Sequence, residues 1–151
     1  MPVQPLAVRA GRRKDALRLA SHNVGGAPKC AGLGYHLRAA VADWMDKDFH
    51  VICVQEARIA ASQVDRVVAA VNAAAAVRAQ QQHRTHAGFD FVCYADSHSA
   101  QSAGTMTLWQ KQLVTSGKLE ILPAAPVNQD PSGRLMAIHA KWGGYTLQLA
   151  S

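Results

Sequence analysis

The sequence has few cysteines and few aromatic residues. Cys30, Cys53 and Cys93 are scattered without a Cys-x-x-Cys pair, and Phe, Trp and Tyr together make up 6% of the 151 residues. An odd, scattered set of cysteines argues against a disulfide framework and against a zinc site, and it favours a reducing compartment. The cysteines therefore predict an intracellular protein, nuclear or cytoplasmic.

Long apolar segments are also lacking. No run approaches the roughly 18 apolar residues that a membrane-spanning helix needs, and no hydrophobic signal segment follows Met1. We therefore expect neither a membrane protein nor a secreted one. Hydrophobic residues nevertheless account for 49% of the chain, which at this length is enough for one globular core.

The net charge of +6 is concentrated at the start of the chain. Residues 1–18 contain five basic side chains and one acidic side chain, with the segment Gly11-Arg12-Arg13-Lys14 at their centre. Such a segment either contacts a polyanion through counterion release or remains a solvated tail. Prolines at positions 2 and 5 oppose helix formation, so we expect residues 1–16 to form a basic flexible arm.

The next part of the chain alternates between strand and helix patterns. Residues 17–22 alternate apolar and polar side chains, and residues 49–55 contain a nearly continuous apolar run, so both segments are predicted strands. Apolar residues recur at spacings of three and four over residues 35–47 and 62–80, which predicts two helices. Parallel strands joined by a helix use a right-handed crossover. We therefore expect the two strands to be neighbours in one sheet, with both helices on the same outer side.

After Gly88 the pattern changes to short strands separated by turn residues. The predicted strands are residues 89–95, 105–109, 119–122, 134–140 and 145–150. This order predicts an α/β fold that has a parallel or mixed sheet at its start and an antiparallel meander after it. No turn residue follows the last strand, so we expect the chain to be part of a longer domain.

Asn23 and Glu56 occupy equivalent positions, because each lies just past the carboxyl end of a predicted strand. Ligands of open α/β sheets collect at that edge. If the two strands are neighbours, the Asn23 amide and the Glu56 carboxylate converge, and such oxygen donors suit a hard cation such as Mg²⁺. The alternatives are that Asn23 is a turn residue and that Glu56 is a surface acid that leads into the helix.

Other polar residues near these positions are less specific. The Arg58 guanidinium has the bidentate reach to contact a phosphate, although a solvated surface arginine fits the pattern equally well. His22 either faces the site or is a buried, hydrogen-bonded histidine. His83 and His86 have the spacing of a metal pair but lack a third ligand.

Two segments resemble the opening strands of the endonuclease/exonuclease/phosphatase superfamily. Residues 19–26 (LASHNVGG) are similar to its first strand, which ends in Asn-Val or Asn-Ile, and residues 51–58 (VICVQEAR) are similar to its second, which ends in Gln-Glu. Residues 102–108, 133–138 and 144–151 resemble three later strands in the same order. The overall pattern is most similar to the apurinic-type endonuclease domains of non-LTR retrotransposons.

The resemblance implies magnesium-dependent phosphodiester hydrolysis by a retrotransposon-type DNA endonuclease. By that resemblance, Glu56 would bind the catalytic Mg²⁺, with Mn²⁺ as an alternative, and Asn23 would help to orient the metal or the phosphate. Arg58 would be a phosphate contact, and DNA would be the partner. Three alternatives stay open: an inactive remnant, a non-enzymatic binding module and, within the superfamily, a lipid or inositol phosphate phosphatase.

The resemblance also implies a fold of two packed mixed sheets with helices outside, of which residues 17–151 would form the first half. The superfamily's general base lies in a Gly-Asp-x-Asn segment, and its phosphate-binding histidine lies in a late Ser-Asp-His segment. This chain has neither at a matching place, because Asp96-Ser97-His98 comes too early in the strand order. We therefore expect a truncated α/β sandwich that is inactive on its own.

Overall fold

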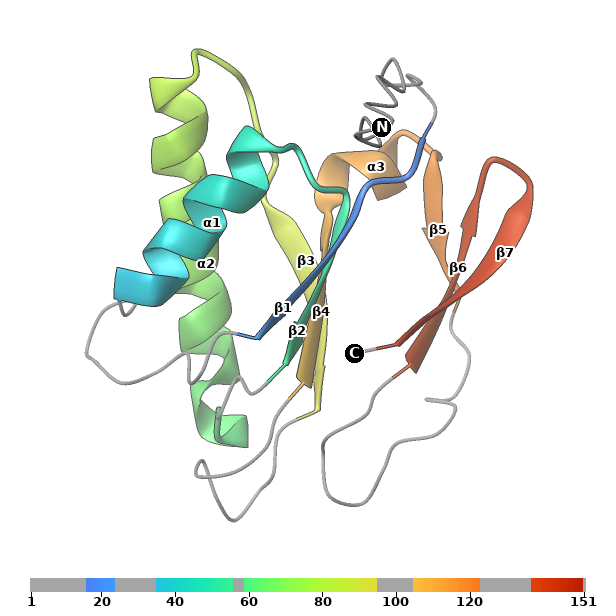
Figure 1. Cartoon of the computed structure of the whole chain (residues 1–151), viewed down its shortest axis with the longest axis horizontal. Coiled ribbons are helices and arrows are strands. Elements are labelled where there is room, and N and C mark those ends of the chain that lie inside the picture. Colours follow the sequence, from blue (N-terminus) through green and yellow to red (C-terminus); the bar gives the residue numbers. More distant parts are fainter. Residues whose placement is uncertain (1–15, 24–34, 56–58, 95–104, 123–136, 151) are drawn as a thin grey trace, which may run out of the picture.

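The computed structural model describes residues 16–23, 35–55, 59–94, 105–122 and 137–150. Figure 1 shows two sheets side by side, with two long helices against the outer face of one of them. The elements in chain order are β1 (Leu19–Asn23), α1 (Tyr35–Asp46), β2 (Val51–Gln55), the 3-10 turn η1 (Ala61–Gln63), α2 (Val64–Gln81), β3 (Phe89–Tyr94), β4 (Thr105–Gln110), α3 (Lys111–Thr115), β5 (Leu119–Ile121), β6 (Ala137–Trp142) and β7 (Tyr145–Ala150).

The four-stranded sheet, sheet A, has the strand order β1-β2-β4-β3. β1 and β2 are parallel neighbours, and β4 pairs antiparallel with both β2 and β3. The expected pairing of strands 17–22 and 49–55 is therefore confirmed. The expected division of the later strands is corrected in one respect, because β3 and β4 join the first sheet, and the meander consists of β5, β6 and β7.

Both helices cover the same face of sheet A, as the sequence predicted (Figure 1). Each helix buries one apolar stripe, and the stripes meet alternate residues of the central strands. The buried core on this face consists of Leu37, Ala40, Val41, Trp44, Met45, Ile52, Val54, Ile59, Val68, Val71, Ala75, Ala79, Phe89, Met106 and Leu108. No helix in the described ranges is long and apolar enough to span a bilayer.

The three-stranded sheet, sheet B, packs against the other face of sheet A. Its strands are antiparallel in the order β5-β6-β7. The core between the sheets consists of Val51, Trp109, Leu113, Leu119, Ala140 and Leu149. The fold is therefore α/β, with a mixed sheet A, an antiparallel sheet B and helices outside.

A polar network closes the end of sheet A at which β1 and β2 begin. Asp48 precedes β2 with a left-handed φ of 52°. Its carboxylate forms an ion pair with Arg18, lies 3.5 Å from Nη1 of Arg84, and accepts a hydrogen bond of 3.0 Å from Nε2 of Gln110. These partners hold the pKa of Asp48 below its usual value, although partial burial opposes them. The network ties the start of both strands to the end of α2 and of β4.

His50 extends this network toward sheet B. Its Nδ1 accepts the backbone N–H of Arg18 at 3.1 Å, and its Nε2 lies 2.8 Å from Nη2 of the same arginine. The imidazole also stacks on Trp142 of β6, with ring centroids 5.1 Å apart. His50 is 6% exposed, so this polar side chain is part of the packing between the two sheets.

Candidate functional site

The carboxyl ends of β1 and β2 lie at one edge of sheet A. The parallel register places Asn23, the last residue of β1, opposite Gln55, the last residue of β2. Glu56 directly follows Gln55 in the sequence. Glu56 and Arg58 themselves lie outside the described residues, so the predicted convergence of Asn23 with Glu56 and the phosphate contact by Arg58 stay predictions.

The two faces of β1 have different environments. His22 points to the helical side, where its Nδ1 accepts a hydrogen bond of 3.1 Å from Nε1 of Trp44 in α1, and the rings meet edge to face at 5.8 Å. Side chains alternate along a strand, so Ser21 and Asn23 point to the opposite side, and both are exposed. His22 is therefore a hydrogen-bonded packing residue, whereas Asn23 is exposed on the opposite face of the sheet.

The side chain of Gln55 connects the two strand ends. Its Nε2 donates to Oγ of Ser21 at 3.0 Å and to the backbone oxygen of Cys53 at 3.2 Å. The sequence marks Gln55 only as part of the Gln-Glu match and predicts no separate role for it. The strand pattern does predict this contact. Residues two apart on a strand share a face, so Ser21 lies on the same face as Asn23, and Gln55 lies on that face as well because it is opposite Asn23 in the parallel pair.

Further polar side chains continue along the same face in β4. Thr105 and Thr107 are 1% and 0% exposed, and they alternate with Met106 and Leu108 of the helical core. Within the described part of the chain, Oγ1 of Thr105 is buried without a hydrogen-bond partner. The face of sheet A opposite the helices is thus polar near the carboxyl ends of β1 and β2. Near the end where these two strands begin, the same face is apolar.

Cys93 of the edge strand β3 does not supply a reactive thiolate. Cys53 and Cys93 are free thiols, and burial raises the pKa of Cys93 to about 11. A thiol with a raised pKa stays protonated at neutral pH and is a poor nucleophile and metal ligand.

The donor chemistry at the strand ends is that of neutral oxygen. The described residues contain no group of three or more His, Cys, Asp or Glu side chains that could hold a metal ion. Asn23 offers an amide oxygen, and such oxygen donors with one added carboxylate fit Mg²⁺, which keeps several waters when bound to proteins. Asn23 is thus one potential oxygen donor among the described residues, and a Mg²⁺ site that also includes Glu56 stays a prediction.

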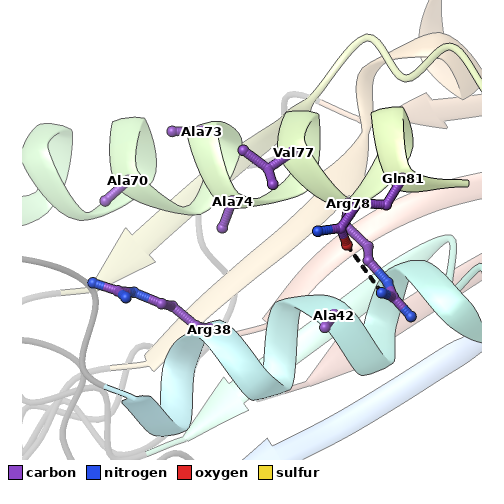
Figure 2. A pocket seen from close by; sticks show the side chains of 8 residues that line it. All are labelled: Arg38, Ala42, Ala70, Ala73, Ala74, Val77, Arg78 and Gln81. Carbon is purple, nitrogen blue, oxygen red and sulfur yellow. Dashed lines mark hydrogen bonds between the residues drawn. The ribbon is translucent and has the colours of Figure 1, made fainter.

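A hollow of about 550 Å³ lies elsewhere, between α1 and α2 (Figure 2). It is lined by residues of both helices: Arg38, Ala42, Ala70, Ala73, Ala74, Val77, Arg78 and Gln81. Arg78 is already paired with Asp46, at 2.7 Å. Since the hollow is on the helical side of sheet A and Asn23 faces the other side, it is not part of the site predicted from the sequence.

Comparisons with known proteins agree with this geometry at the level of the fold. No protein-family model matches the chain, and a search of curated proteins finds no match. The crystal structure of AP endonuclease LMAP from Leishmania major matches with a TM-score of 0.55 and 16% identity, over 86% of this chain and 38% of that chain. An endonuclease/exonuclease/phosphatase family protein from Leptotrichia buccalis C-1013-b matches with a TM-score of 0.51 and 13% identity, over 90% of this chain and 53% of that chain.

The chain thus spans less than two thirds of either protein. The order of strands, the helices outside and these two matches show that the chain shares its fold with the corresponding part of these two proteins.

Proposed function

We propose that this chain contributes the metal-binding strand pair of a magnesium-dependent phosphodiesterase, a DNA endonuclease of the type encoded by non-LTR retrotransposons. The observation that carries the proposal is the register of β1 and β2, in which Asn23 lies opposite Gln55. Glu56 is the next residue in the sequence, so the register supports a pair of oxygen ligands at one sheet edge. The fold similarity to an AP endonuclease supports DNA as the substrate.

Each candidate residue has a distinct task in this proposal. Glu56 and Asn23 would hold Mg²⁺, or Mn²⁺ in its place, through a carboxylate and an amide oxygen. The bound cation offsets negative charge on the phosphate oxygens during hydrolysis. The amide N–H groups of Asn23 can donate to a phosphate oxygen, and the Arg58 guanidinium would donate two parallel N–H groups to the same phosphate.

Hydrolysis also needs a general base to deprotonate water. His22 is adjacent to Asn23 in the sequence, but it points to the helical side and is bonded to Trp44. Loss of a positioned acid or base typically costs about 10²–10⁴-fold in rate. We therefore expect residues 1–151 to bind the cation and DNA without cleaving DNA at a measurable rate.

Cation binding can be tested by titrating Mn²⁺ into the chain and following the free ion by electron paramagnetic resonance. We expect Glu56→Gln to weaken Mn²⁺ binding at least tenfold, because the substitution removes the anionic ligand. Glu120→Gln, which neutralises an exposed acid in β5 of sheet B, is the matched control and should leave the affinity unchanged. Equal affinities of the wild type and Glu56→Gln would refute the proposed metal site.

Substrate class can be tested by fluorescence anisotropy of a labelled DNA duplex with Mg²⁺ present. Unlabelled duplex should compete for the chain, whereas inositol phosphates at equal charge concentration should not. Competition by inositol phosphates alone would favour the phosphatase alternative. Nicking of supercoiled plasmid completes the test, since cleavage by the wild type that Glu56→Ala abolishes would contradict the expected inactivity of this chain while supporting an endonuclease.

A further inference from the structure

Strand β3 is the last strand in the order of sheet A, and its neighbour is β4. The backbone N–H of Lys111 donates to the carbonyl of Gly88 at 3.0 Å, which fixes the phase of this antiparallel pair. Hydrogen-bonded and non-hydrogen-bonded pairs alternate along an antiparallel ladder. The backbone groups of β3 that face away from β4 are therefore those of Phe89, Phe91 and Cys93.

The side-chain amide of Asn72 in α2 takes the place of a neighbouring strand at Phe89. Its Oδ1 accepts the Phe89 backbone N–H at 2.7 Å, and its Nδ2 donates to the Phe89 carbonyl at 3.1 Å. A residue of an added antiparallel strand would make the same two bonds. Gly88 leaves room for this contact, because a Cβ built on it would lie 3.1 Å from Oδ1 of Asn72. The outward groups of Phe89 are thus already paired within the chain.

Asp90 occupies the next outward donor along the strand. Its Oδ1 accepts the backbone N–H of Phe91 at 2.9 Å, and its side chain is exposed, so it also places a negative charge at the edge. Charged side chains on edge strands oppose the addition of another strand. Such protection suits this strand, because its sequence, FDFVCY, is rich in strand-forming residues and contains no proline.

A second copy of this chain matches the outward groups of β3. Antiparallel pairing of two β3 strands about Phe91 is symmetric, as a twofold interface requires, and it places Phe89 of each copy opposite Cys93 of the other. Each hydrogen bond of this register needs a backbone group of Phe89 or the N–H of Phe91, and Asn72 and Asp90 bond those same groups. We propose that Asn72 and Asp90 close the edge of sheet A against strand addition by a second copy, and that their removal turns β3 into a dimer interface.

The test uses the full chain and follows both association and the exchange of individual amide protons. Asn72→Leu keeps the approximate size of the side chain and removes both bonds to Phe89, and Asp90→Ala frees the Phe91 N–H. Sedimentation velocity from micromolar to millimolar concentration should show that this double variant dimerises more strongly than the wild type. In the double variant, exchange of the Phe91 and Cys93 amides should slow about tenfold as concentration rises, corresponding to about one hydrogen bond. In the wild type, exchange of these amides should not depend on concentration.

Gln112→Leu is the matched control. The Gln112 side chain accepts the backbone N–H of Ala87 at 3.1 Å and donates to Oε1 of Gln110 at 2.8 Å, so the variant loses amide bonds of the same kind while β3 keeps its caps. Destabilisation alone speeds amide exchange, whereas strand pairing slows it. Gln112→Leu should therefore show no slowing of the Phe91 and Cys93 amides at high concentration.

A milder pair of substitutions keeps the test decisive if Asn72→Leu does not fold. Asn72→Asp retains the acceptor for the Phe89 N–H and loses the donor to the Phe89 carbonyl, and with Asp90→Ala it should also dimerise. Concentration-independent exchange of the Phe91 and Cys93 amides in the folded double variant would overturn the inference. The same slowing in the wild type or in Gln112→Leu would overturn it as well, because the caps would then make no difference.

Discussion

The pair of strands β1 and β2 differs sharply between its two ends. At the start, the Asp48 carboxylate is surrounded by Arg18, Arg84 and Gln110, and Gln110 is 2% exposed. At the finish, Asn23 is exposed, and Nε2 of Gln55 in β2 donates a hydrogen bond to Oγ of Ser21 in β1. Within the described residues, the pair of strands thus begins in a partly buried polar network and ends in exposed polar side chains.

This difference separates stability from binding. A partly buried network stabilises the fold through its paired members, and the loss of one member leaves the others partly desolvated without that partner. An exposed strand end has little stability to lose, and its polar groups can exchange water for a ligand. We therefore expect substitutions where β1 and β2 begin to lower the free energy of unfolding, and substitutions where they end to weaken ligand binding.

Asp48→Ala should have the largest effect on stability. It leaves Arg18, Arg84 and Gln110 without their shared acceptor, and it places alanine at a left-handed φ of 52°. We expect the free energy of unfolding, measured by urea denaturation, to fall by roughly 2–3 kcal/mol, which lies between the losses for exposed and for buried ion pairs, because Arg18 and Asp48 are partly exposed. Asparagine adopts the same left-handed backbone conformation readily. Asp48→Asn should therefore lower the free energy of unfolding by less than Asp48→Ala and isolate the effect of the charge.

Asp43→Ala is the control for Asp48→Ala. Asp43 pairs with Lys47 at 2.9 Å, but both side chains are about half exposed, and such pairs contribute about 0.5 kcal/mol or less. If Asp43→Ala destabilised the chain as much as Asp48→Ala, the polar network at the start of β2 would have no special role.

The same chemical change at the two ends sharpens the comparison. Gln110→Met removes donors to Asp48 and to the Phe49 carbonyl, at 3.0 and 2.8 Å, in a buried place, and should cost about 2 kcal/mol. Gln55→Met removes bonds at a partly exposed place and should cost less than about 1 kcal/mol. If urea denaturation gave equal losses of unfolding free energy for the two variants, the carboxyl ends of β1 and β2 would stabilise the fold as much as the ends where these strands begin.

The stability of the polar network where β1 and β2 begin should also decrease in mild acid. Burial, and then the charge of Arg18, lower the pKa of His50, and burial likewise lowers the pKa of His86. As pH falls below the ordinary histidine pKa of about 6.5, the unfolded chain takes up protons first, so stability is lost in that direction. A neutral imidazole accepts at one nitrogen and a protonated one at none, so protonation also breaks the contact with Arg18.

His50→Gln is the variant that tests this pH dependence. The slope of unfolding free energy between pH 7 and about pH 5 should become shallower than in the wild type, and His50→Gln combined with His86→Gln should be shallower still. An unchanged slope in the double variant would show that other groups carry the acid sensitivity.

Asn23→Ala should have the smallest effect on stability and a clear effect on binding. An exposed substitution away from a network usually changes the free energy of unfolding by less than about 0.5 kcal/mol. Mn²⁺ affinity should fall at the same time, because an oxygen ligand is removed. A loss of stability above about 1 kcal/mol with unchanged Mn²⁺ binding would favour the alternative that Asn23 is a turn residue.

The sequence predicted the elements whose apolar pattern is strong. β7 was predicted at residues 145–150 and is observed there, and the helices at 35–47 and 62–80 correspond to α1 and α2 within two residues at each end. β2 starts at Val51 rather than at Phe49. Asp48 has a left-handed φ and His50 lies in a bend, so Phe49 and His50 belong to the turn before the strand. α3 was missed, because a helix of five residues is too short to show a period.

The candidate site was predictable only as far as its strand ends. The position of Asn23 at the carboxyl edge followed from the strand pattern and is observed. The roles of Asn23, Glu56 and Arg58 stay predictions. The bond between Gln55 and Ser21 and the ion pair between Arg18 and Asp48 join residues 30 or more positions apart, and such contacts depend on register and backbone conformation that a single sequence does not specify.

The pairing of β2 with β4 has a consequence for how the chain acquires its structure during synthesis. Ile52 pairs with Leu108, which is made 56 residues later, whereas β6 and β7 pair across a turn from Trp142 to Tyr145. At about 5–20 residues per second, β2 leaves the ribosome roughly 3–11 seconds before its antiparallel neighbour. Sheet B can close as soon as it is made, while the long-range pairing of sheet A is the slow step and the period of greatest exposure to aggregation.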